Sequence, residues 1–343
     1  MFAHAEGCAT NASGANSHAE GSNTTAKADT SHAEGAGTVA LGYYSHVEGY
    51  NTTAYGKASH AEGHGNYINI NITGSENSTT YTLSDTNSSI QAGVIITYDG
   101  VYAKIIEYNS DTKIITVDKT LSAESLSNAG AAVYDLSASG DYSHAEGRNI
   151  IASGDYSHAE GWNTTASGRV SHTEGESTTA SGYSSHAEGY RTKANGNSSH
   201  AEGLCTIAEG ACSHAEGYYT IAEGEDSHVQ GKFNIGGGDT LAHIIGNGAN
   251  IGSRSNAHTI DWDGNAWFAG DVYVGSTSGV NKDEGSRKLV TADEMNAAIE
   301  DGIASNAQTD EEALGIMMEL GMFTPMADGQ TILTDEKNNI LVI

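Results

Sequence analysis

The residues of this sequence that could do chemistry are histidine and glutamate, set two positions apart and repeated at a fixed interval. Twelve histidines follow one another in two blocks at steps of fourteen residues, from His4 to His60 and from His144 to His228. Eleven of them have a glutamate two residues later, and the twelfth has Gln230. Imidazole and carboxylate groups can bind a metal ion, transfer protons or form hydrogen-bonded pairs. Whichever applies, the fold must give every copy the same surroundings.

The segment around each histidine alternates as a β-strand does. In 157–161 (Ser-His-Ala-Glu-Gly) the small residues fall on one face, and His158 and Glu160 on the other. A looser copy of the frame follows seven residues later, in 164–168. Two short strands with opposed small faces, joined at glycines that take positive φ, form one coil of a thin parallel β solenoid. At ~4.8 Å per coil, twelve coils predict a rod on the order of 58 Å long.

The His/Glu face hardly varies, whereas the outer face of the second strand drifts from Thr25 to Lys193 to Ile207. Constant chemistry over so many coils predicts that this face packs against identical neighbours, on or near the axis of a symmetric oligomer. The positions predicted to face the axis are His18, Glu20, His32, Glu34, His46, Glu48, His60, Glu62, His144, Glu146, His158, Glu160, His172, Glu174, His186, Glu188, His200, Glu202, His214, Glu216 and His228.

Two interpretations of this face remain open. Symmetry-related imidazole rings, for example those of His158 and His172, could bind Zn, Ni or Fe. The alternative, which we favour, is a ladder of His–Glu hydrogen bonds between chains that needs no metal, with His⁺–Glu⁻ pairs keeping the rod stable from pH 7.5 to about 5. We therefore predict no cofactor. We also predict no catalytic site, because an active site needs one pocket of unlike groups.

Composition and charge exclude several classes of protein. The 343 residues include 43 Gly, 1 Pro, 15 Lys plus Arg and 44 Asp plus Glu, with a net charge of −29. No basic face for nucleic acid is visible. No apolar run approaches the roughly 18 residues of a membrane span, and the first residues lack a signal-peptide pattern. Three cysteines without CxxC spacing predict free thiols.

The repeat is interrupted once and ends before the C-terminus. Alternating segments such as 67–72 replace it, and 136–140 then restores the second strand in register, so the insertion should be a small β domain that is separable from the rod. Its tyrosines Tyr81, Tyr98, Tyr102 and Tyr108 are candidate receptor-binding residues, although they could equally belong to its core. The predicted regions are a first β-roll block (1–65), the inserted β domain (66–135), a second β-roll block (136–231), a β neck (232–288) and a C-terminal segment with two helices and a hairpin (289–343).

The fourteen-residue frame resembles the head repeats of trimeric autotransporter adhesins over residues 3 to about 231, apart from the insertion. This resemblance implies an all-β, left-handed parallel β-roll that forms a homotrimer with the first strand turned inward. The chain departs from those heads in placing His and Glu where they usually carry aliphatic residues. It also shows no stretch that resembles their membrane-anchor strands. SHAEG arrays, with a following segment similar to 257–275, look more like those of phage and prophage tail fibres of Firmicutes.

These observations together predict a non-enzymatic tail fibre or receptor-binding protein. Its expected partners are two further copies of itself, other tail or fibre proteins, and a glycan or protein of the host cell surface. Neither nucleic acid nor membrane insertion is expected. A virion location follows, with the cell surface as the location in one alternative, a bacterial adhesin or extracellular filament subunit. The other alternative is a carbohydrate-degrading tailspike, which would need paired carboxylates in a groove apart from the repeats.

Overall fold

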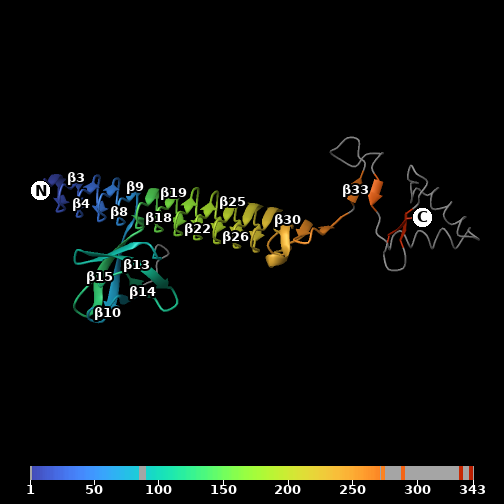
Figure 1. The fold of residues 1–343 in the computed structure, drawn as a ribbon. Coiled ribbons are helices and arrows are strands. Elements are labelled where there is room, and N and C mark those ends of the chain that lie inside the picture. The colour runs from blue at the N-terminus through green and yellow to red at the C-terminus, as the bar shows by residue number, and fades with distance from the viewer. Residues whose placement is uncertain are drawn as a thin grey trace, which may run out of the picture. The chain divides into compact units, whose positions relative to one another are not determined.

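The computed structural model describes residues 2–84 and 90–270 and four short strands beyond them. The chain divides into two compact units, Met1–Ala269 and Gly270–Ile343. The first unit contains a β-roll with a barrel inserted into one coil (Figure 1). No helix among the described residues is long and apolar enough to cross a membrane.

The first strand of every coil joins one long parallel sheet, in which each residue pairs with the residue fourteen positions on, as His144 does with His158. These strands are β1 (His4–Cys8), β3 (His18–Ser22), β5 (His32–Ala33), β7 (His46–Val47), β9 (His60–His64), β17 (His144–Arg148), β19 (His158–Trp162), β21 (His172–Thr173), β23 (His186–Ala187), β25 (His200–Leu204), β27 (His214–Tyr218) and β29 (His228–Lys232).

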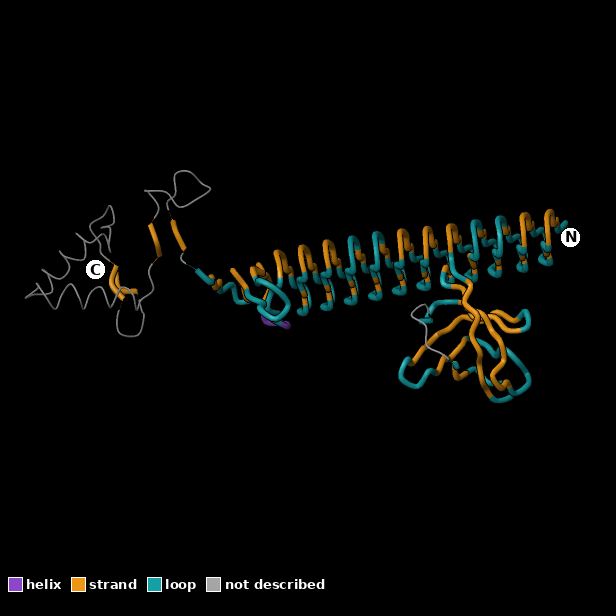
Figure 2. Tube along the Cα trace, turned by 180° about the vertical axis from the view of Figure 1, so that it is seen from behind, coloured by secondary structure: helices purple, strands orange, loops and turns teal. Residues whose placement is uncertain are grey.

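The second strands form a parallel sheet of eleven strands with the same register, as in the pair Thr165 and Thr179. They are β2 (Asn11–Ala12), β4 (Thr25–Ala26), β6 (Val39–Ala40), β8 (Thr52–Ala54), β16 (Leu136–Ala138), β18 (Ile151–Ala152), β20 (Thr165–Ala166), β22 (Thr179–Ala180), β24 (Lys193–Ala194), β26 (Ile207–Ala208) and β28 (Ile221–Ala222). Figure 2 shows the coils stacked one behind another. The predicted parallel β-roll with fourteen-residue coils is confirmed.

The interior of the roll contains only small side chains in most coils. Ala159 and Ala166 are fully buried, as are their counterparts in every coil after the first, and Ser157 and Thr164 are buried beside them. Such residues remove little apolar surface from water. The backbone ladders therefore contribute much of what holds one coil to the next.

Two kinds of glycine allow the coils to approach closely. Gly161 has a φ of +102° and lies so near the next coil that a Cβ would be 2.2 Å from the oxygen of Gly175. We expected the second glycine of the repeat to have a positive φ as well, but the structure contradicts this. A Cβ on Gly168 would lie 1.9 Å from the oxygen of Gly182, and the positive φ of this turn falls on Val170. Space, rather than backbone conformation, requires glycine there.

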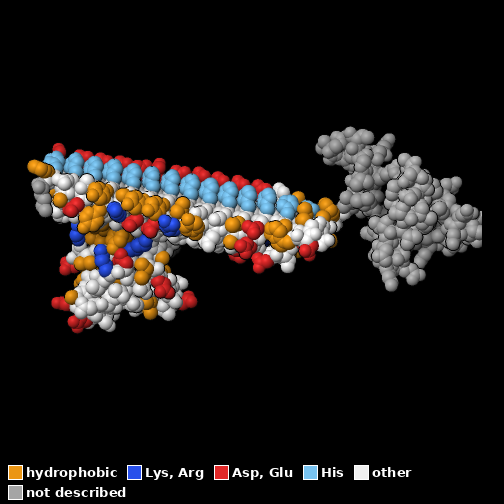
Figure 3. Space-filling view, viewed as in Figure 1, with side chains coloured by type: hydrophobic (Ala, Val, Ile, Leu, Met, Phe, Trp, Pro, Cys, Tyr) orange, Lys and Arg blue, Asp and Glu red, His pale blue; other side chains and the backbone are white. Residues whose placement is uncertain are grey.

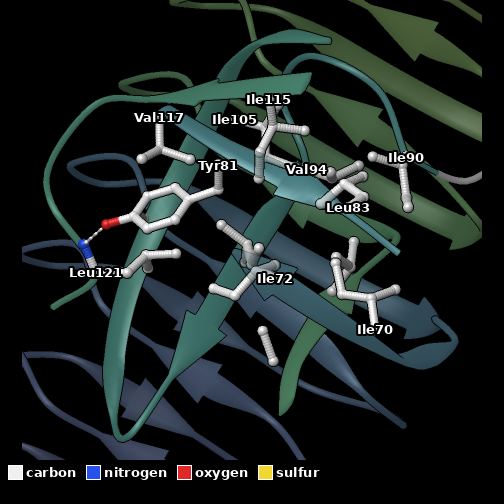
Figure 4. Close-up of a cluster of buried hydrophobic side chains, with 14 of the residues drawn as sticks. Ile70, Ile72, Tyr81, Leu83, Ile90, Val94, Ile105, Ile115, Val117 and Leu121 are labelled. Carbon is white, nitrogen blue, oxygen red and sulfur yellow. Dashed lines mark hydrogen bonds between the residues drawn. The ribbon is translucent and has the colours of Figure 1, made fainter. Parts of the chain in front are cut away.

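The insertion is a closed six-stranded barrel in the order β10-β11-β14-β13-β12-β15. Its strands are β10 (Tyr67–Gly74), β11 (Thr80–Leu83), β12 (Ile95–Tyr98), β13 (Val101–Asn109), β14 (Ile114–Val117) and β15 (Leu126–Tyr134). Isoleucine, leucine and valine fill its interior around Tyr81, whose hydroxyl accepts a hydrogen bond from the Leu121 amide at 2.9 Å (Figure 4). This core is larger and more apolar than any part of the roll interior.

The roll continues across the insertion without a change of register. β9 pairs with β17, and β8 pairs with β16, as if residues 66–135 were absent. The barrel nevertheless covers the second sheet: Ser137 and Ser139 donate hydrogen bonds to the carbonyl of Gly93, and Ile151 belongs to the barrel core. Barrel and roll therefore share a packed interface, so the expectation of a separable insertion needs revision.

The roll ends in larger residues and antiparallel pairing. After the 3-10 turn η1 (Gly238–Thr240), β30 (Leu241–Asn247) extends the first sheet in parallel, and β31 (Asn256–Asp261) and β32 (Ala266–Phe268) then add antiparallel strands. In the second unit β33 (Val272–Val274) pairs with β34 (Arg287–Leu289), and β35 (Ile332–Thr334) pairs with β36 (Ile340–Val342) as an antiparallel pair. The helices predicted at 291–304 and 309–320 lie outside the described residues.

Candidate functional site

The repeated histidines and glutamates form one continuous band along the first sheet, which we call the His/Glu stripe (Figure 3). It consists of the repeat histidines from His18 to His228 and the residue two positions after each, which is glutamate except for Gln230. Parallel pairing places each imidazole over the equivalent ring of the next coil. Successive rings stack with centroids about 4.8 Å apart, as for His32 and His46 or His186 and His200. The side chains of the paired histidines are 33–41% exposed.

His–Glu pairs form within a single chain, between successive coils. Nε2 of His46 lies 3.2 Å from Oε1 of Glu34, and the pairs His200–Glu188 and His214–Glu202 have distances of 3.1 and 3.2 Å. The parallel register allows these pairs within one chain, because it brings each glutamate beside the histidine of the next coil. Bonds of this kind between chains stay a prediction.

Other imidazoles have a buried nitrogen without a hydrogen-bond partner in the described part of the chain. Their nearest carboxylates lie farther away, at 3.6 Å for His186–Glu174 and 4.0 Å for His158–Glu160. The Nε2 atoms concerned are those of His18, His32, His60, His144, His158, His172, His186 and His228. One chain alone therefore leaves several imidazole nitrogens of the stripe without a hydrogen bond. A buried polar atom without a hydrogen bond lowers the stability of a fold.

The stripe holds several imidazoles in the neutral form. Burial lowers the pKa of His60, His144 and His172, and the neighbouring imidazoles of the stack lower it further. Nearby glutamates act in the opposite direction but do not cancel these effects. Desolvation and like-charge repulsion both disfavour the imidazolium form.

Two carboxyl groups of the stripe are coupled directly. A hydrogen bond with Glu48 raises the pKa of Glu62 to about 7, and burial and the charge of Glu146 act in the same direction. The same hydrogen bond lowers the pKa of Glu48. The two opposite shifts indicate that these carboxyl groups can share a proton as the pH falls through about 7.

The stripe also brings together the ligand types of a transition-metal site. In His186–Glu188–His200 and in His144–Glu146–His158, one ligand atom from each residue lies within 4.8 Å of the others. Imidazole and carboxylate donors suit Zn, Ni or Fe. Of the two histidines named from the sequence, His158 belongs to such a group, whereas no group among the described residues includes His172.

The candidate receptor-binding tyrosines do not form one surface. Tyr81 is 1% exposed in the barrel core, so its prediction as a binding residue is wrong. Tyr98 and Tyr108 are half-buried and pack against the same core. Only Tyr102 faces the roll, where it lines a cavity with Lys27. The alternation of 80–83 could have revealed that Tyr81 points inward, as Leu83 does.

A cavity of about 540 Å³ lies where barrel and roll meet, and no pattern in the sequence predicts it. Its lining comes from both the roll and the inserted barrel. Lys27 and Tyr43 belong to the roll, and Lys119 belongs to the barrel. Nothing in the local sequence brings these positions together, because the orientation of the barrel on the second sheet decides it. The one available signal is that lysines are scarce in this acidic chain.

Comparisons with known proteins agree on the roll. Residues 33–59 match the YadA head domain repeat in two copies. No curated protein sequence matches the chain.

Two solved structures of phage tailspikes show a weak likeness. One is the tailspike protein gp49 from Pseudomonas phage LKA1, with 14% identity, a TM-score of 0.18, and coverage of 69% of this chain and 34% of the tailspike. The other is the Gp54 tailspike of Acinetobacter baumannii bacteriophage AP22 in complex with A. baumannii capsular saccharide, with 11% identity, a TM-score of 0.17, and coverage of 67% and 40%. The chain thus spans about a third to two fifths of their length.

Such low scores support no argument about function, whereas the repeat match falls on coils β5 to β8 of the roll itself. The stripe therefore lies on a β-roll that contains YadA head domain repeats.

Proposed function

We propose that this chain is a structural, non-enzymatic adhesive fibre protein, carried on the tail of a phage or prophage as a homotrimer. In the trimer the His/Glu stripes of three chains pack together at the axis. The observation that carries the proposal is the stripe itself, which keeps one composition and one geometry over the whole roll while remaining about one third exposed. A surface of identical stacked groups is matched best by other copies of itself.

The end of the roll gives independent support. Trp262, Trp267 and Phe268 are 52%, 56% and 47% exposed on β32 and on the turn before it. Exposed aromatic side chains are enriched at protein interfaces. Three copies of this neck would cover them, at the place where the roll gives way to antiparallel strands.

The first sheet carries further apolar groups beside the stripe. In several coils the second residue after the glutamate is a large apolar one that is 37–50% exposed. These residues are Tyr50, Trp162, Leu204 and Tyr218. Packing chains against this sheet would bury them along with the imidazoles. Hydrophobic burial would then drive the association, and the His–Glu pairs would supply its polar complement.

A charge placed on the stripe tests the assembly. We expect His158→Lys, His172→Lys and His186→Lys together to convert the trimer to monomers at pH 7.5, because three like charges per level would crowd the axis. The matched control is Thr165→Lys, Thr179→Lys and Ile207→Lys on the second sheet, whose ladder already contains Lys193. Native mass spectrometry reads the number of chains, and circular dichroism checks that both variants keep their β structure. An undiminished trimer in the stripe variant would refute the axial position.

The place of the fibre needs a separate test. Antibodies against this chain should label the tails of particles released by the bacterial strain that carries the gene. Label confined to the cell envelope would instead support the bacterial adhesin or filament subunit. Incubation of the purified protein with host capsular or wall polysaccharide should release no fragments, and the appearance of shorter saccharides would indicate a tailspike enzyme.

A further inference from the structure

A cavity of about 540 Å³ lies at the junction of barrel and roll, away from the stripe. It lies against the second sheet, and in so thin a roll the outer faces of the two sheets point in opposite directions. Figure 3 shows lysine side chains gathered between the roll and the barrel. The cavity therefore stays open to solvent when the stripe packs at an axis.

Three lysines line this cavity: Lys27 and Lys57 from the roll, and Lys119 from the barrel. The whole chain has 15 Lys plus Arg against 44 Asp plus Glu, so this gathering is unusual for its surface. None of the three forms an ion pair with a carboxylate, since within residues 2–84 and 90–270 the carboxylate ion pairs involve only histidines. Their ammonium groups contact a carbonyl and aromatic rings rather than pairing directly with a carboxylate.

The acidic residues of the cavity are occupied elsewhere. Asp29 accepts a hydrogen bond from the Ala15 amide at 2.7 Å, and Asp141 accepts one from the Lys57 amide at 2.8 Å. Nearby Asp118 accepts bonds from the Tyr55 hydroxyl and the Lys104 amide. These carboxylates hold turns and the barrel in place but keep their negative charge, so the three lining lysines outnumber the two lining aspartates.

Aromatic rings contact all three lysines, and Nζ of Lys57 lies 5.7 Å from the centre of the Tyr142 ring. Nζ of Lys27 lies 5.5 Å from the centre of the Tyr102 ring and donates a hydrogen bond to the Gly100 carbonyl at 3.1 Å. Nζ of Lys119 lies 5.1 Å from the Tyr55 ring. Cation–π contacts of this kind restrain flexible side chains without neutralising their charge.

The remaining wall suits a sugar ring. Tyr43 is 58% exposed and presents an aromatic surface with a hydroxyl group, and the cavity is large enough for a few monosaccharide units. An apolar face with converging hydrogen-bonding groups is what a saccharide needs, and the unpaired ammonium groups favour an anionic one.

We infer that this cavity binds a saccharide that carries carboxylate or phosphate groups. Lys27, Lys57 and Lys119 contact the anionic groups, and Tyr43 packs against a sugar ring. The inference rests on the proposed adhesive function, for which it names the receptor class and its place. It does not need the trimer, because every lining residue comes from one chain.

Isothermal titration calorimetry with the full chain tests the inference. The probes are a hyaluronan hexasaccharide, which carries carboxylates, a mannose pentasaccharide phosphate, which carries a phosphate, and chitohexaose, which is neutral. We expect at least one anionic probe to bind, chitohexaose not to bind, and binding to weaken as NaCl rises from 50 to 500 mM. Binding of the carboxylate probe alone or of the phosphate probe alone would identify the anionic group.

Variants locate the site. Lys27→Gln, Lys57→Gln and Lys119→Gln together should weaken binding at least tenfold. Lys193→Gln, the same change on the second sheet away from the cavity, should leave binding unchanged. Absence of anionic binding, equal binding of chitohexaose, or an unaffected triple variant would overturn the inference.

The number of chains in each sample, read from its native mass, distinguishes a failure of this inference from a failure of the proposed function. A trimer that binds none of the probes overturns the saccharide site and leaves the trimeric fibre standing. A monomer that binds an anionic probe supports the site and contradicts the assembly.

Discussion

Glu62 is the residue at which the stripe departs most from its own repeat. Its carboxyl group shares a hydrogen bond with Glu48, one coil away, and its pKa is raised to about 7. Glu62 also lies 3.6 Å from Nε2 of His60, whereas other glutamates of the stripe, such as Glu188, are hydrogen-bonded to a histidine. A carboxyl pKa that is higher in the folded state than in the unfolded chain contributes stability at low pH, and this contribution is lost as the pH rises through about 7.

Glu62→Gln should therefore raise the melting temperature at pH 8 and flatten its dependence on pH between 6 and 8. The amide can donate to Glu48 without needing a proton, so the repulsion between two carboxylates disappears. Thermal melts followed by circular dichroism measure this. The control, Glu188→Gln, loses the carboxylate beside His200 and should give no gain at pH 8. A lower melting temperature for Glu62→Gln at pH 8 would contradict the shared proton.

The lowered pKa values of His60, His144 and His172 change the expected response to acid. The unfolded chain binds protons at these positions more readily than the folded one, so stability falls as the pH drops through the unperturbed value of about 6.5. This corrects the expectation of steady stability down to about pH 5. The melting temperature should already decline between pH 7 and 5.5, and substituting all three residues with Asn should reduce the decline.

This measurement is best made in the Glu62→Gln background, where the opposing titration of that carboxyl group is absent. A melting temperature that holds or rises down to pH 5 would show that His⁺–Glu⁻ pairs outweigh burial. EDTA at pH 7.5 adds a check, since a stripe stabilised without metal should not respond to it.

Gly168→Ala tests the requirement for space between coils. The new methyl group would lie 1.9 Å from a backbone oxygen that cannot move without breaking the ladder, so we expect a loss of about 1–3 kcal/mol or more. Gly130→Ala is the matched control, because its nearest atom lies 3.9 Å away and its φ is not positive. Urea unfolding gives both free energies. Equal effects of the two substitutions would refute close approach as the reason for this glycine.

At the scale of elements, the repeat frame was predictable and the barrel interface was not. The spacing of histidine gave the coil length, and 136–140 gave the return to register, because both follow from alternation in a strand. In the sequence, the ladder that contains Ile151 shows only variation from coil to coil, which gives no sign of a packing partner. The structure shows why it varies: Val39, Thr53, Ser137 and Ile151 are buried under the barrel, whereas Lys193 is exposed. A packing partner from a distant segment leaves no periodic signal.

The same limit applies to the site residues. The stripe could be predicted because every coil repeats it. The cavity could not, because Lys27 and Lys119 meet only through the orientation of the barrel. Tyr81 was misassigned for a related reason: an aromatic residue in a small domain can serve the core or the surface, and here its hydroxyl is satisfied internally.

Removal of the barrel should now destabilise the roll unless its footprint is repaired. Replacing residues 66–135 with a short Gly/Ser turn exposes Ile151, which is fully buried in the intact protein, and burial of such a side chain contributes roughly 1.5–3 kcal/mol. Adding Ile151→Thr should recover much of the stability, because Thr165 occupies the next position of that ladder. Thermal melts of the two deletion variants, with and without Ile151→Thr, measure the loss of stability and its recovery. Equal stability of the deleted and intact proteins would show that the interface contributes nothing.

At the scale of the whole molecule, the account depends on three chains sharing the stripe. A single thin roll with an interior of Ala, Ser, Thr and Gly buries little apolar surface, and its His/Glu stripe and neck aromatics remain exposed. Association of three chains would bury more apolar surface and would cover the His/Glu stripe and the neck aromatics. It would also place the barrels, with their cavities, on the outside of the fibre, where a receptor could reach them.

Sedimentation equilibrium of the full chain at pH 7.5 tests this central claim most directly. We expect a single species of three times the 35.5 kDa chain mass, unchanged over a hundredfold range of protein concentration. A stable species of 35.5 kDa across that range would contradict the account, because a lone roll would then hold its His/Glu stripe without any partner.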